Sequence, residues 1–562
     1  MYILGVGTGF VHDGSAVLIK NGAIIAAVEE ERFDRVKHGI GYPYRAINYC
    51  LEEGGVSLED LDYIAFNFKP FKKYRDDLWL NLKALFHRFE SIKYSIYLGT
   101  TAIYPFLFTL KEAEKIKMET SGKKRVQFVD HHLCHAASCF YPSPFEEAAI
   151  LTLDNKGEGI SASFNIGRCN KIERIKEIQL PHSLGMLYLA FTFYLGFKSG
   201  DEYKVMGLAS YGEPAFYDVL KDILQITPGG GFRINPDYFD YVPEGIFSRK
   251  FYEKLGDPRK KGERIEERHI NIASSLQKRV EDVALSMVKW LYEKTKSRNL
   301  CMAGGVTLNS VMNGVIEKKG PFENIFVQPA ASDIGTSLGA ALELYFRKSA
   351  EPIRVPMEHA YLGAEYSNEE IEDALKLAKL KYKRMEDVAA DTAKLIAGGK
   401  IVGWFQTRME WGPRALGARS ILADPRKKEM KDVVNRWVKH RENFRPFAPS
   451  ILMERCHEYF DCNHPSPYML FVYDVLETKK NEIQAITHVD GTARVHTVNK
   501  KDNPLYYKLI QEFEQLTGVP VILNTSFNIM GEPIVRTPSE AIRCFYATGM
   551  DYLVIGPYLL SK

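Results

Sequence analysis

The chain opens with Tyr2-Ile3-Leu4-Gly5-Val6-Gly7, an apolar run of residues that favour β-structure. Two further apolar runs follow at 16–20 and 23–29, and Asn21-Gly22 between them is the pair typical of a two-residue hairpin turn. This opening stretch therefore predicts an antiparallel β-meander.

Downstream of the meander, strand-like runs alternate with helical periodicity, which indicates an α/β domain with a mixed sheet. The strand-like runs lie at 125–129, 148–153, 300–303 and 324–327. The helical runs lie at 270–296, 308–318 and 335–346. We find no repeat of fixed period.

The pattern breaks at Glu351-Pro352-Ile353-Arg354-Val355-Pro356, where the prolines favour an extended linker. We therefore predict one domain over 1–350 and a second over 360–562. In the second, helical periodicity at 368–380 and 388–397 precedes strand-like runs at 401–405, 492–498, 519–523 and 552–555. This order fits a second α/β or α+β unit.

Composition limits the class of function. The 562 residues carry 74 Lys and Arg against 71 Asp and Glu, so neither nucleic acid nor a membrane surface is favoured as a partner. No apolar run approaches the ~20 residues that span a bilayer. The first residues lack a basic segment before an apolar core, and the eight cysteines form no Cys-x-x-Cys pair. We expect a cytoplasmic protein with reduced thiols.

The sharpest local motif is Asp130-His131-His132-Leu133-Cys134-His135. In a helix, His131 and His135 lie at i and i+4 on one face, the spacing that helical metal sites use. Single histidines are usually packed or solvated, but three within five positions favour a metal site. Further ligands must come from elsewhere in the chain.

Several strand ends carry glycines and short polar residues that suit a nucleotide. Asp154 opens Asp-Asn-Lys-Gly-Glu-Gly, and His12 lies at the first turn after the opening strand. Gly304-Gly305-Val306-Thr307-Leu308-Asn309 and Asp333-Ile334-Gly335 each precede a predicted helix, whose N-terminal amides can receive phosphate. Helix capping and hairpin turns explain such residues equally well one at a time.

Together these turns resemble the actin-like, RNase H-type ATPase superfamily, and the added His-x-x-x-His pair resembles its carbamoyl- and threonylcarbamoyl-transfer subgroup. The resemblance implies that Gly304, Gly305, Asn309 and Gly335 bind the nucleotide. It implies His12 beside the transferred carbonyl and a structural role for His132. The implied metal ligands are His131, His135, Asp154 and Asp333.

The second half is rich in arginine around Trp411-Gly412-Pro413-Arg414-Ala415-Leu416-Gly417-Ala418-Arg419-Ser420. Guanidinium groups bind phosphate oxygens in a bidentate manner, and the apolar neighbours favour a buried loop over a solvated one. His488-Val489-Asp490-Gly491-Thr492 and Leu523-Asn524-Thr525-Ser526 add short polar groups, although each alone fits an Asx-type turn.

In order along nearly the whole chain, these motifs and Phe444-Arg445-Pro446-Phe447-Ala448-Pro449-Ser450 resemble the O-carbamoyltransferase family of nodulation-factor and antibiotic biosynthesis. The resemblance implies a YrdC-like second domain that forms carbamoyladenylate from ATP and carbamoyl phosphate. The first domain, with Fe²⁺ or another divalent metal, then carbamoylates a hydroxyl; Mg²⁺ accompanies ATP. The implied catalytic residues of activation are Arg414, Lys431 and Arg441. The implied binding residues are Arg408, Arg419, Arg494, Asn524 and Ser526.

Three alternatives stay open at this stage. A hydrogenase-maturation carbamoyltransferase would add an acylphosphatase-like start and Cys-x-x-Cys zinc fingers, and a tRNA threonylcarbamoyl transferase would add a basic patch. An actin-like, ATP-regulated binding protein belongs to a different class altogether. The identity of the hydroxylated small-molecule acceptor and the oligomeric state, a homodimer included, are not encoded in these motifs.

Overall fold

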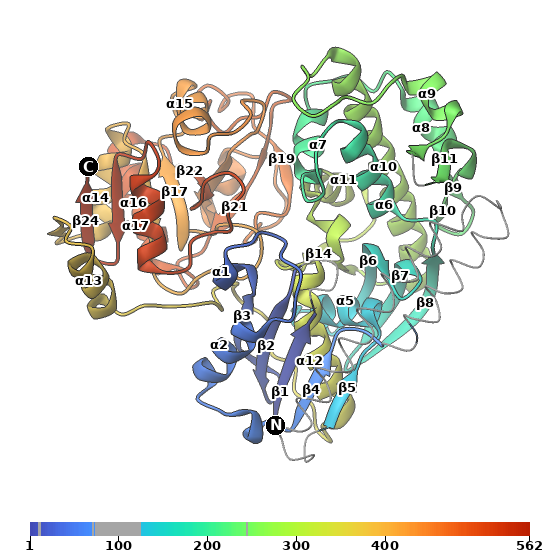
Figure 1. Cartoon of the computed structure of the whole chain (residues 1–562), viewed down its shortest axis with the longest axis horizontal. Helices are drawn as coiled ribbons and strands as arrows, with labels where there is room; N and C mark the ends of the chain where they lie inside the picture. The colour runs from blue at the N-terminus through green and yellow to red at the C-terminus, as the bar shows by residue number, and fades with distance from the viewer. Residues whose placement is uncertain (9–12, 70–71, 73–124, 243–244) are drawn as a thin grey trace. The chain divides into compact units, whose positions relative to one another are not determined.

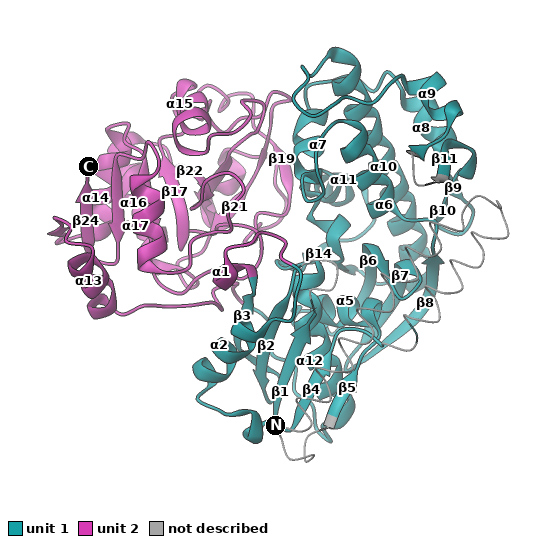
Figure 2. Cartoon of the chain, in the orientation of Figure 1, with its two compact units in different colours: residues 1–30, 40–357 teal, residues 31–39, 358–562 magenta. Residues whose placement is uncertain are grey.

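The structure is a computed structural model that describes residues 1–8, 13–69, 72, 125–242 and 245–562. The chain divides into two compact units: unit 1 comprises 1–30 and 40–357, and unit 2 comprises 31–39 and 358–562 (Figure 2). The short segment 31–39 includes α1 (Glu31–Asp34). It belongs to unit 2 because Arg32 donates to the Gly412 carbonyl at 2.9 Å and Arg35 to the Ile534 carbonyl at 2.7 Å.

The first sheet of unit 1 contains the predicted meander (Figure 1). Its order is β3-β2-β1-β4-β5, with β1–β2 and β2–β3 antiparallel and β1–β4 and β4–β5 parallel. The strands are β1 (Tyr2–Gly7), β2 (Ser15–Lys20), β3 (Ala23–Glu29), β4 (Tyr63–Phe66) and β5 (Arg125–Phe128).

The second sheet of unit 1 repeats the topology of the first. Its order is β14-β13-β6-β7-β8, again with a three-stranded antiparallel meander followed by two parallel strands. The strands are β6 (Glu147–Gly157), β7 (Ile160–Arg168), β8 (Lys171–Gln179), β13 (Asn299–Ala303) and β14 (Asn324–Val327). Two sheets of this order confirm the actin-like arrangement, although the sequence carries no visible repeat.

Two helices, α5 (His131–Phe140) and α12 (Thr336–Lys348), pack closely against each other. A Cβ atom at Gly339 would collide with the Cys134 carbonyl, and one at Gly5 would collide with the Ser337 carbonyl. Glycine therefore lets α12 approach both α5 and β1, which brings the segments that carry the predicted metal ligands together.

The other elements of unit 1 connect or cover these sheets. They are α2 (Tyr44–Gly54), η1 (Leu58–Asp60), α6 (Leu184–Tyr194), α7 (Glu202–Ala209), α8 (Tyr217–Ile223), β9 (Leu224–Thr227), β10 (Gly231–Ile234), η3 (Pro236–Tyr238), β11 (Phe239–Val242), β12 (Gly245–Phe247), α9 (Arg249–Leu255), α10 (Glu267–Thr295), η4 (Gly305–Leu308), α11 (Ser310–Lys319) and η5 (Asp333–Gly335). The predicted helices at 270–296, 308–318 and 335–346 correspond to α10, α11 and α12, with ends shifted by one to three residues.

Unit 2 is built on an eight-stranded mixed sheet of order β15-β24-β23-β16-β17-β22-β18-β21. Its strands are β15 (Lys383–Arg384), β16 (Val402–Phe405), β17 (Arg419–Ala423), β18 (Ala448–Leu452), β21 (His496–Val498), β22 (Val521–Ser526), β23 (Tyr552–Ile555) and β24 (Tyr558–Ser561). Its helices are α13 (Asn368–Leu377), α14 (Val388–Ala397), α15 (Glu429–Val433), the π-helical η6 (Val434–Val438), η7 (Met453–Glu458), α16 (Pro504–Thr517) and α17 (Pro538–Tyr546). The YrdC-like assignment of this unit stays a prediction.

The single strand predicted at 492–498 is wrong. The run forms β20 (Thr492–Arg494), which pairs with β19 (Val472–Asp474), and then β21, which pairs with β18 in the large sheet. Between them the Val495 amide donates to the Phe471 carbonyl. The alternation of apolar and polar residues specifies extended backbone but not the partner strand, so it cannot reveal a change of sheet.

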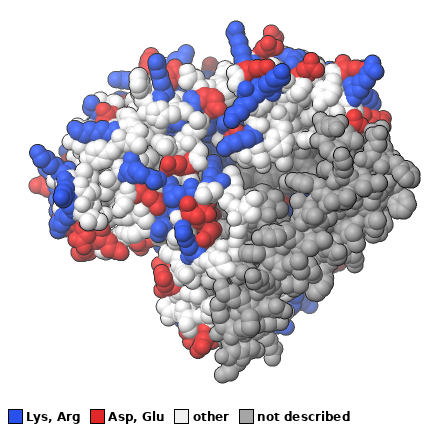
Figure 3. Space-filling model, viewed as in Figure 1, with Lys and Arg blue, Asp and Glu red and all other residues white. Residues whose placement is uncertain are grey.

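The charged surface agrees with the small net charge. Basic and acidic side chains lie side by side over the described part of the face in Figure 3. Within the described residues, no helix combines the length and the apolar character needed to cross a bilayer.

Candidate functional site

The first candidate site begins at the N-terminus of α5. Asp130 is the N-cap, and its side chain accepts from the Leu133 amide at 3.2 Å. His131 and His135 follow on one face of the helix, with ring centroids 4.8 Å apart. The helical spacing that predicted a shared ligand is therefore present.

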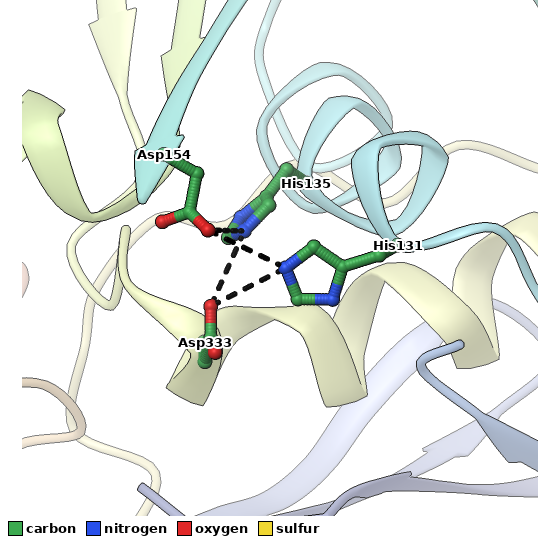
Figure 4. Close-up of side chains that lie close together, drawn as sticks. All are labelled: His131, His135, Asp154 and Asp333. Atoms are coloured by element: carbon green, nitrogen blue, oxygen red, sulfur yellow. Dashed lines mark ion pairs between the residues drawn. The ribbon is translucent and has the colours of Figure 1, made fainter. Parts of the chain in front are cut away.

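Two carboxylates from distant segments complete the cluster (Figure 4). Asp154 lies in β6 where its pairing with β7 is interrupted, and Asp333 lies in the turn η5 before α12. His131 Nε2 is 3.6 Å from Asp154 Oδ2 and 3.4 Å from Asp333 Oδ1. His135 Nε2 is 4.0 Å and 3.5 Å from the same two atoms.

These four groups fit a metal ion. Their ligand atoms all lie within 4.8 Å of one another, and the Nε2 atoms of His131 and His135 are buried without a hydrogen bond. Bond lengths of about 2.1 Å place neighbouring ligands of a tetrahedral ion about 3.4 Å apart, close to the observed separations. Two imidazoles with two carboxylates suit a divalent transition metal.

Opposite charges within the cluster shift the pKa values of His131 and Asp154. Burial lowers the pKa of His131, but the Asp333 and Asp154 carboxylates outweigh it and raise that pKa well above its usual value. Burial and Asp333 raise the pKa of Asp154, but the two histidines outweigh them and lower it. The two histidines thus favour the ionised form of Asp154, which is the form that binds a metal.

His132 has the structural role that the resemblance implied. Its Nδ1 lies 2.7 Å from Thr152 Oγ1 and its Nε2 lies 3.0 Å from the Ile160 carbonyl, so both nitrogens are occupied within the core. Burial lowers its pKa to about 3, and the ring is neutral at physiological pH.

The predicted nucleotide turns border this cluster. Gly304 has a φ of 102° and leaves no room for a Cβ beside Leu153, while the Gly305 amide donates to Asp154 Oδ1 at 3.0 Å. Asn309 caps α11 by accepting from the Met312 amide at 3.0 Å. Gly335 lies in η5 against the Ala330 carbonyl. His12 lies outside the described residues.

In unit 2, the arginine-rich loop is folded around a carboxylate that the sequence analysis missed. Glu410 is 1% exposed, and its Oε1 accepts from the backbone amides of Leu416, Ala418 and Arg419 at 2.7, 2.7 and 3.1 Å. The signal was available, because an acid between Met409 and Trp411 in an apolar stretch is expensive to bury unless it accepts hydrogen bonds.

Two of the predicted phosphate-binding arginines are held by the protein itself. Arg419 is fully buried, stacks over the Phe405 ring at 3.7 Å and donates to the carbonyls of Gln406, Thr407 and Ala364 at 2.5, 3.0 and 3.0 Å. Arg408 donates to the Gly363 carbonyl at 2.9 Å. The geometry places Arg419 in the framework of the loop, because its guanidinium donors are directed at backbone oxygens.

The other predicted arginines converge on Arg494. Burial lowers the pKa of Arg494 well below its usual value, and the cations Arg414, Arg441 and Arg445 lower it further. Arg414 itself has a pKa lowered by burial to about 10. Within the described part of unit 2, Arg494 has no ion-pair partner. Placing the Arg494 charge beside other cations costs free energy, and an anion bound next to it would offset that cost.

Lys431 and His488 border this arginine group. Lys431 lies on α15, and its charge and that of Arg494 act on His488. Burial is the main reason that the pKa of His488 falls to about 4. The Thr492 amide donates to Asp490 Oδ1 at 3.1 Å, so the segment also contains the Asx-type turn that the sequence allowed.

Asn524 and Ser526 are both hydrogen-bonded to neighbouring protein groups. The Asn524 amide donates to the Ala415 carbonyl and to Ser450 Oγ, both at 3.0 Å. Lys439, a buried residue that the sequence analysis missed, donates to the Ser526 and Asn528 carbonyls at 2.7 and 2.8 Å. Both contacts brace the arginine-rich loop and strand β22. Lys439 carried no distinctive signal beyond its place in a basic stretch.

Comparison with known proteins identifies the family of the chain. The family model described as carbamoyltransferase N-terminus matches residues 2–342, and the model described as carbamoyltransferase C-terminus matches residues 393–562. An uncharacterized protein of Synechocystis sp. is 43% identical over 100% of this chain and 97% of its own length. The nodulation protein NolNO of Sinorhizobium fredii is 39% identical over 98% of this chain and 79% of its own.

A third relative carries a specific activity in its name. The 3'-hydroxymethylcephem-O-carbamoyltransferase of Amycolatopsis lactamdurans is 30% identical over 77% of this chain and 80% of its own length. The two family models together match both units, and the relatives align along most of the chain. This protein therefore belongs to the carbamoyltransferase family and is a carbamoyltransferase enzyme.

Proposed function

We propose that the protein is an ATP-dependent O-carbamoyltransferase that makes carbamoyladenylate in unit 2 and transfers its carbamoyl group to a hydroxyl in unit 1. The observation that carries this proposal is the presence of two sites that attract ligands of opposite charge. The group around Arg494 is positive and accepts a polyphosphate, whereas the His131 cluster contains two carboxylates and accepts a divalent cation.

The proposed activation in unit 2 consumes one water molecule. Water cleaves carbamoyl phosphate to carbamate and phosphate, and a carbamate oxygen then attacks the α-phosphorus of ATP. The bond from that phosphorus to the β,γ-phosphates breaks, and pyrophosphate leaves with its electron pair. Arg414, Arg441, Arg494 and Lys431 would bind the phosphate oxygens and stabilise the negative charge that develops. Mg²⁺ accompanies ATP in this step.

The proposed transfer occurs in unit 1. The acceptor oxygen forms a bond to the carbamoyl carbon, the bond to AMP breaks, and AMP leaves as the phosphate anion. His131, His135, Asp154 and Asp333 would hold Fe²⁺ or another divalent metal, which supplies Lewis-acid stabilisation of negative charge. His12 would take the proton of the acceptor hydroxyl. Gly304, Gly305, Asn309 and Gly335 would frame the nucleotide part of the adenylate.

Two steps in one chain suit the chemistry of the carbamoyl group. Its nitrogen donates into the carbonyl, which makes it a weak electrophile, and adenylation supplies a better leaving group. The acceptor is a hydroxylated small molecule such as a sugar or an antibiotic precursor. The name of the 3'-hydroxymethylcephem-O-carbamoyltransferase relative supports this substrate class.

The test separates the two steps. The full chain is supplied with ATP, Mg²⁺ and carbamoyl phosphate, and pyrophosphate release is measured with and without a panel of hydroxylated acceptors. We expect pyrophosphate release that depends on carbamoyl phosphate, and an acceptor product whose mass increases by one carbamoyl group. Acceptor carbamoylation without ATP, or no pyrophosphate under any condition, would contradict the proposal.

A further inference from the structure

Asn67 lies beside the metal cluster but has no place in the reaction as proposed so far. It follows directly after β4 and is 3% exposed. A buried amide must satisfy its polar atoms inside the protein. Asn67 does so by contacting three segments that build the site.

The first contact is made by the Asn67 backbone. Its carbonyl oxygen lies 3.3 Å from His131 Nδ1. A carbonyl only accepts, so in the neutral ring this contact places the proton on Nδ1 and leaves the lone pair of Nε2 directed at Asp154 and Asp333. The backbone of Asn67 thus selects the tautomer in which His131 can bind a metal.

The second contact reaches the segment that carries Asp333. Asn67 Nδ2 donates to Thr336 Oγ1 at 2.8 Å, and Thr336 Oγ1 donates in turn to the Asp333 carbonyl at 2.5 Å. Thr336 is fully buried, and this chain of two hydrogen bonds fixes the turn that carries the Asp333 carboxylate.

The third contact fixes the orientation of the amide. Asn67 Oδ1 accepts from the Thr8 backbone amide at 3.3 Å. Because that amide only donates, the oxygen of the side chain must point toward Thr8 and the nitrogen toward Thr336. One side chain therefore ties the end of β1 to the turn that holds Asp333.

We propose that Asn67 is a positioning residue that holds His131 and Asp333 at the separation a metal ion needs. This inference rests on the metal binding that belongs to the proposed function. The backbone contact orients one ligand, and the side chain, through Thr336, orients the other. Loss of the side chain frees the Asp333 turn without removing any ligand.

The test is a Co²⁺ titration of the full chain, because Co²⁺ absorption reports both affinity and ligand geometry. Asn67→Ala removes the donor to Thr336. Thr336→Val removes the hydroxyl at nearly constant volume, and Thr336→Ser restores it. Asn165→Ala is the matched control, since Asn165 is also buried in unit 1 and its side-chain amide donates to Ser163 Oγ at 2.9 Å. Thermal unfolding of each metal-free variant is measured in parallel.

We expect Asn67→Ala to weaken Co²⁺ binding about 10-fold or more and to alter the visible spectrum. Thr336→Val should weaken it several-fold, Thr336→Ser and Asn165→Ala should match the wild type, and the Asn67→Ala and Thr336→Val effects should not add. Equal affinities for Thr336→Val and Thr336→Ser would overturn the inference, even where Asn67→Ala fails to fold.

The outcome for the wild type separates this inference from the proposed function. If the wild type binds Co²⁺ and His135→Ala does not, the metal site stands, and unchanged binding by Asn67→Ala refutes only the role of Asn67. A wild-type chain that binds no Co²⁺ would overturn the metal step of the proposed function and this inference with it.

Discussion

The two candidate sites differ in how their charges interact. In unit 1, two imidazoles face two carboxylates across 3.4 to 4.0 Å, so the charges compensate one another inside the protein. In unit 2, Arg414, Arg441 and Arg445 act on Arg494 with the same sign of charge. The first site is preformed by attraction between its own residues, whereas the second is held in place by surrounding hydrogen bonds against repulsion.

This difference explains why the framework residues differ between the units. In unit 1 the ligands attract one another, and the buried Asn67 and Thr336 support them. In unit 2, Glu410 and Lys439 fix the backbone around the arginines, and the Arg419 guanidinium donates its hydrogen bonds to carbonyl oxygens. A site of like charges needs such support because its functional side chains cannot stabilise one another.

The largest expected effect follows from a change to the metal cluster of unit 1. His135→Ala removes one imidazole from the cluster, and we expect metal binding and acceptor carbamoylation to fall below detection. Pyrophosphate release should persist, because unit 2 keeps its arginines. Metal content, carbamoylated product and pyrophosphate are measured on the same preparation. Parallel loss of pyrophosphate release would show that the two sites do not divide the reaction.

The second prediction concerns a change to the arginine group of unit 2. Arg494→Ala should lower pyrophosphate release about 100- to 1,000-fold, because it removes a guanidinium donor to the developing negative charge. Co²⁺ binding should be unchanged. The matched control is Arg543→Ala, since Arg543 is 59% exposed and pairs with Glu532 at the surface. Comparable losses in the two variants would argue against a special role for Arg494.

The third prediction concerns the support of the arginine-rich loop. Glu410→Gln keeps an acceptor oxygen but removes the charge that three backbone amides share, and we expect the free energy of unfolding to fall by about 2 kcal/mol. Urea unfolding of both proteins checks this. A variant as stable as the wild type would mean that the loop does not depend on the carboxylate charge.

The smallest expected effect is a pH dependence of stability. The pKa of His488 is lowered to about 4 in the folded protein, below its ordinary 6.5, so the unfolded chain binds more protons between these values. Wild-type stability relative to His488→Gln should therefore be fully present above pH 6.5 and decrease as the pH falls toward 4. Urea midpoints for both proteins at pH 4.5, 5.5 and 7 test this, and a constant difference would refute it.

Much of the fold followed from local patterns. The Asn21-Gly22 turn and the flanking apolar runs predicted the meander of β1, β2 and β3. The second meander, over β6, β7 and β8, was not recognised as a repeat, because strand order depends on which apolar faces pack together and many sequences satisfy the same order. The prediction of one strand at 492–498 was wrong for a related reason, since a pattern that specifies extended backbone does not specify the partner strand.

The sequence by itself determined those features that depend on near neighbours: the face shared by His131 and His135, the Asx-type turn at 490–492, and the basic character of the loop at 408–419. Only the tertiary structure decided that Asp154 and Asp333 meet these histidines, that Arg494 remains among cations, and that Arg419 is held by carbonyl groups. Helical and strand periodicity follow from backbone geometry within a few residues. The partner of a buried charge is set instead by whichever distant groups the folded chain brings within hydrogen-bond distance.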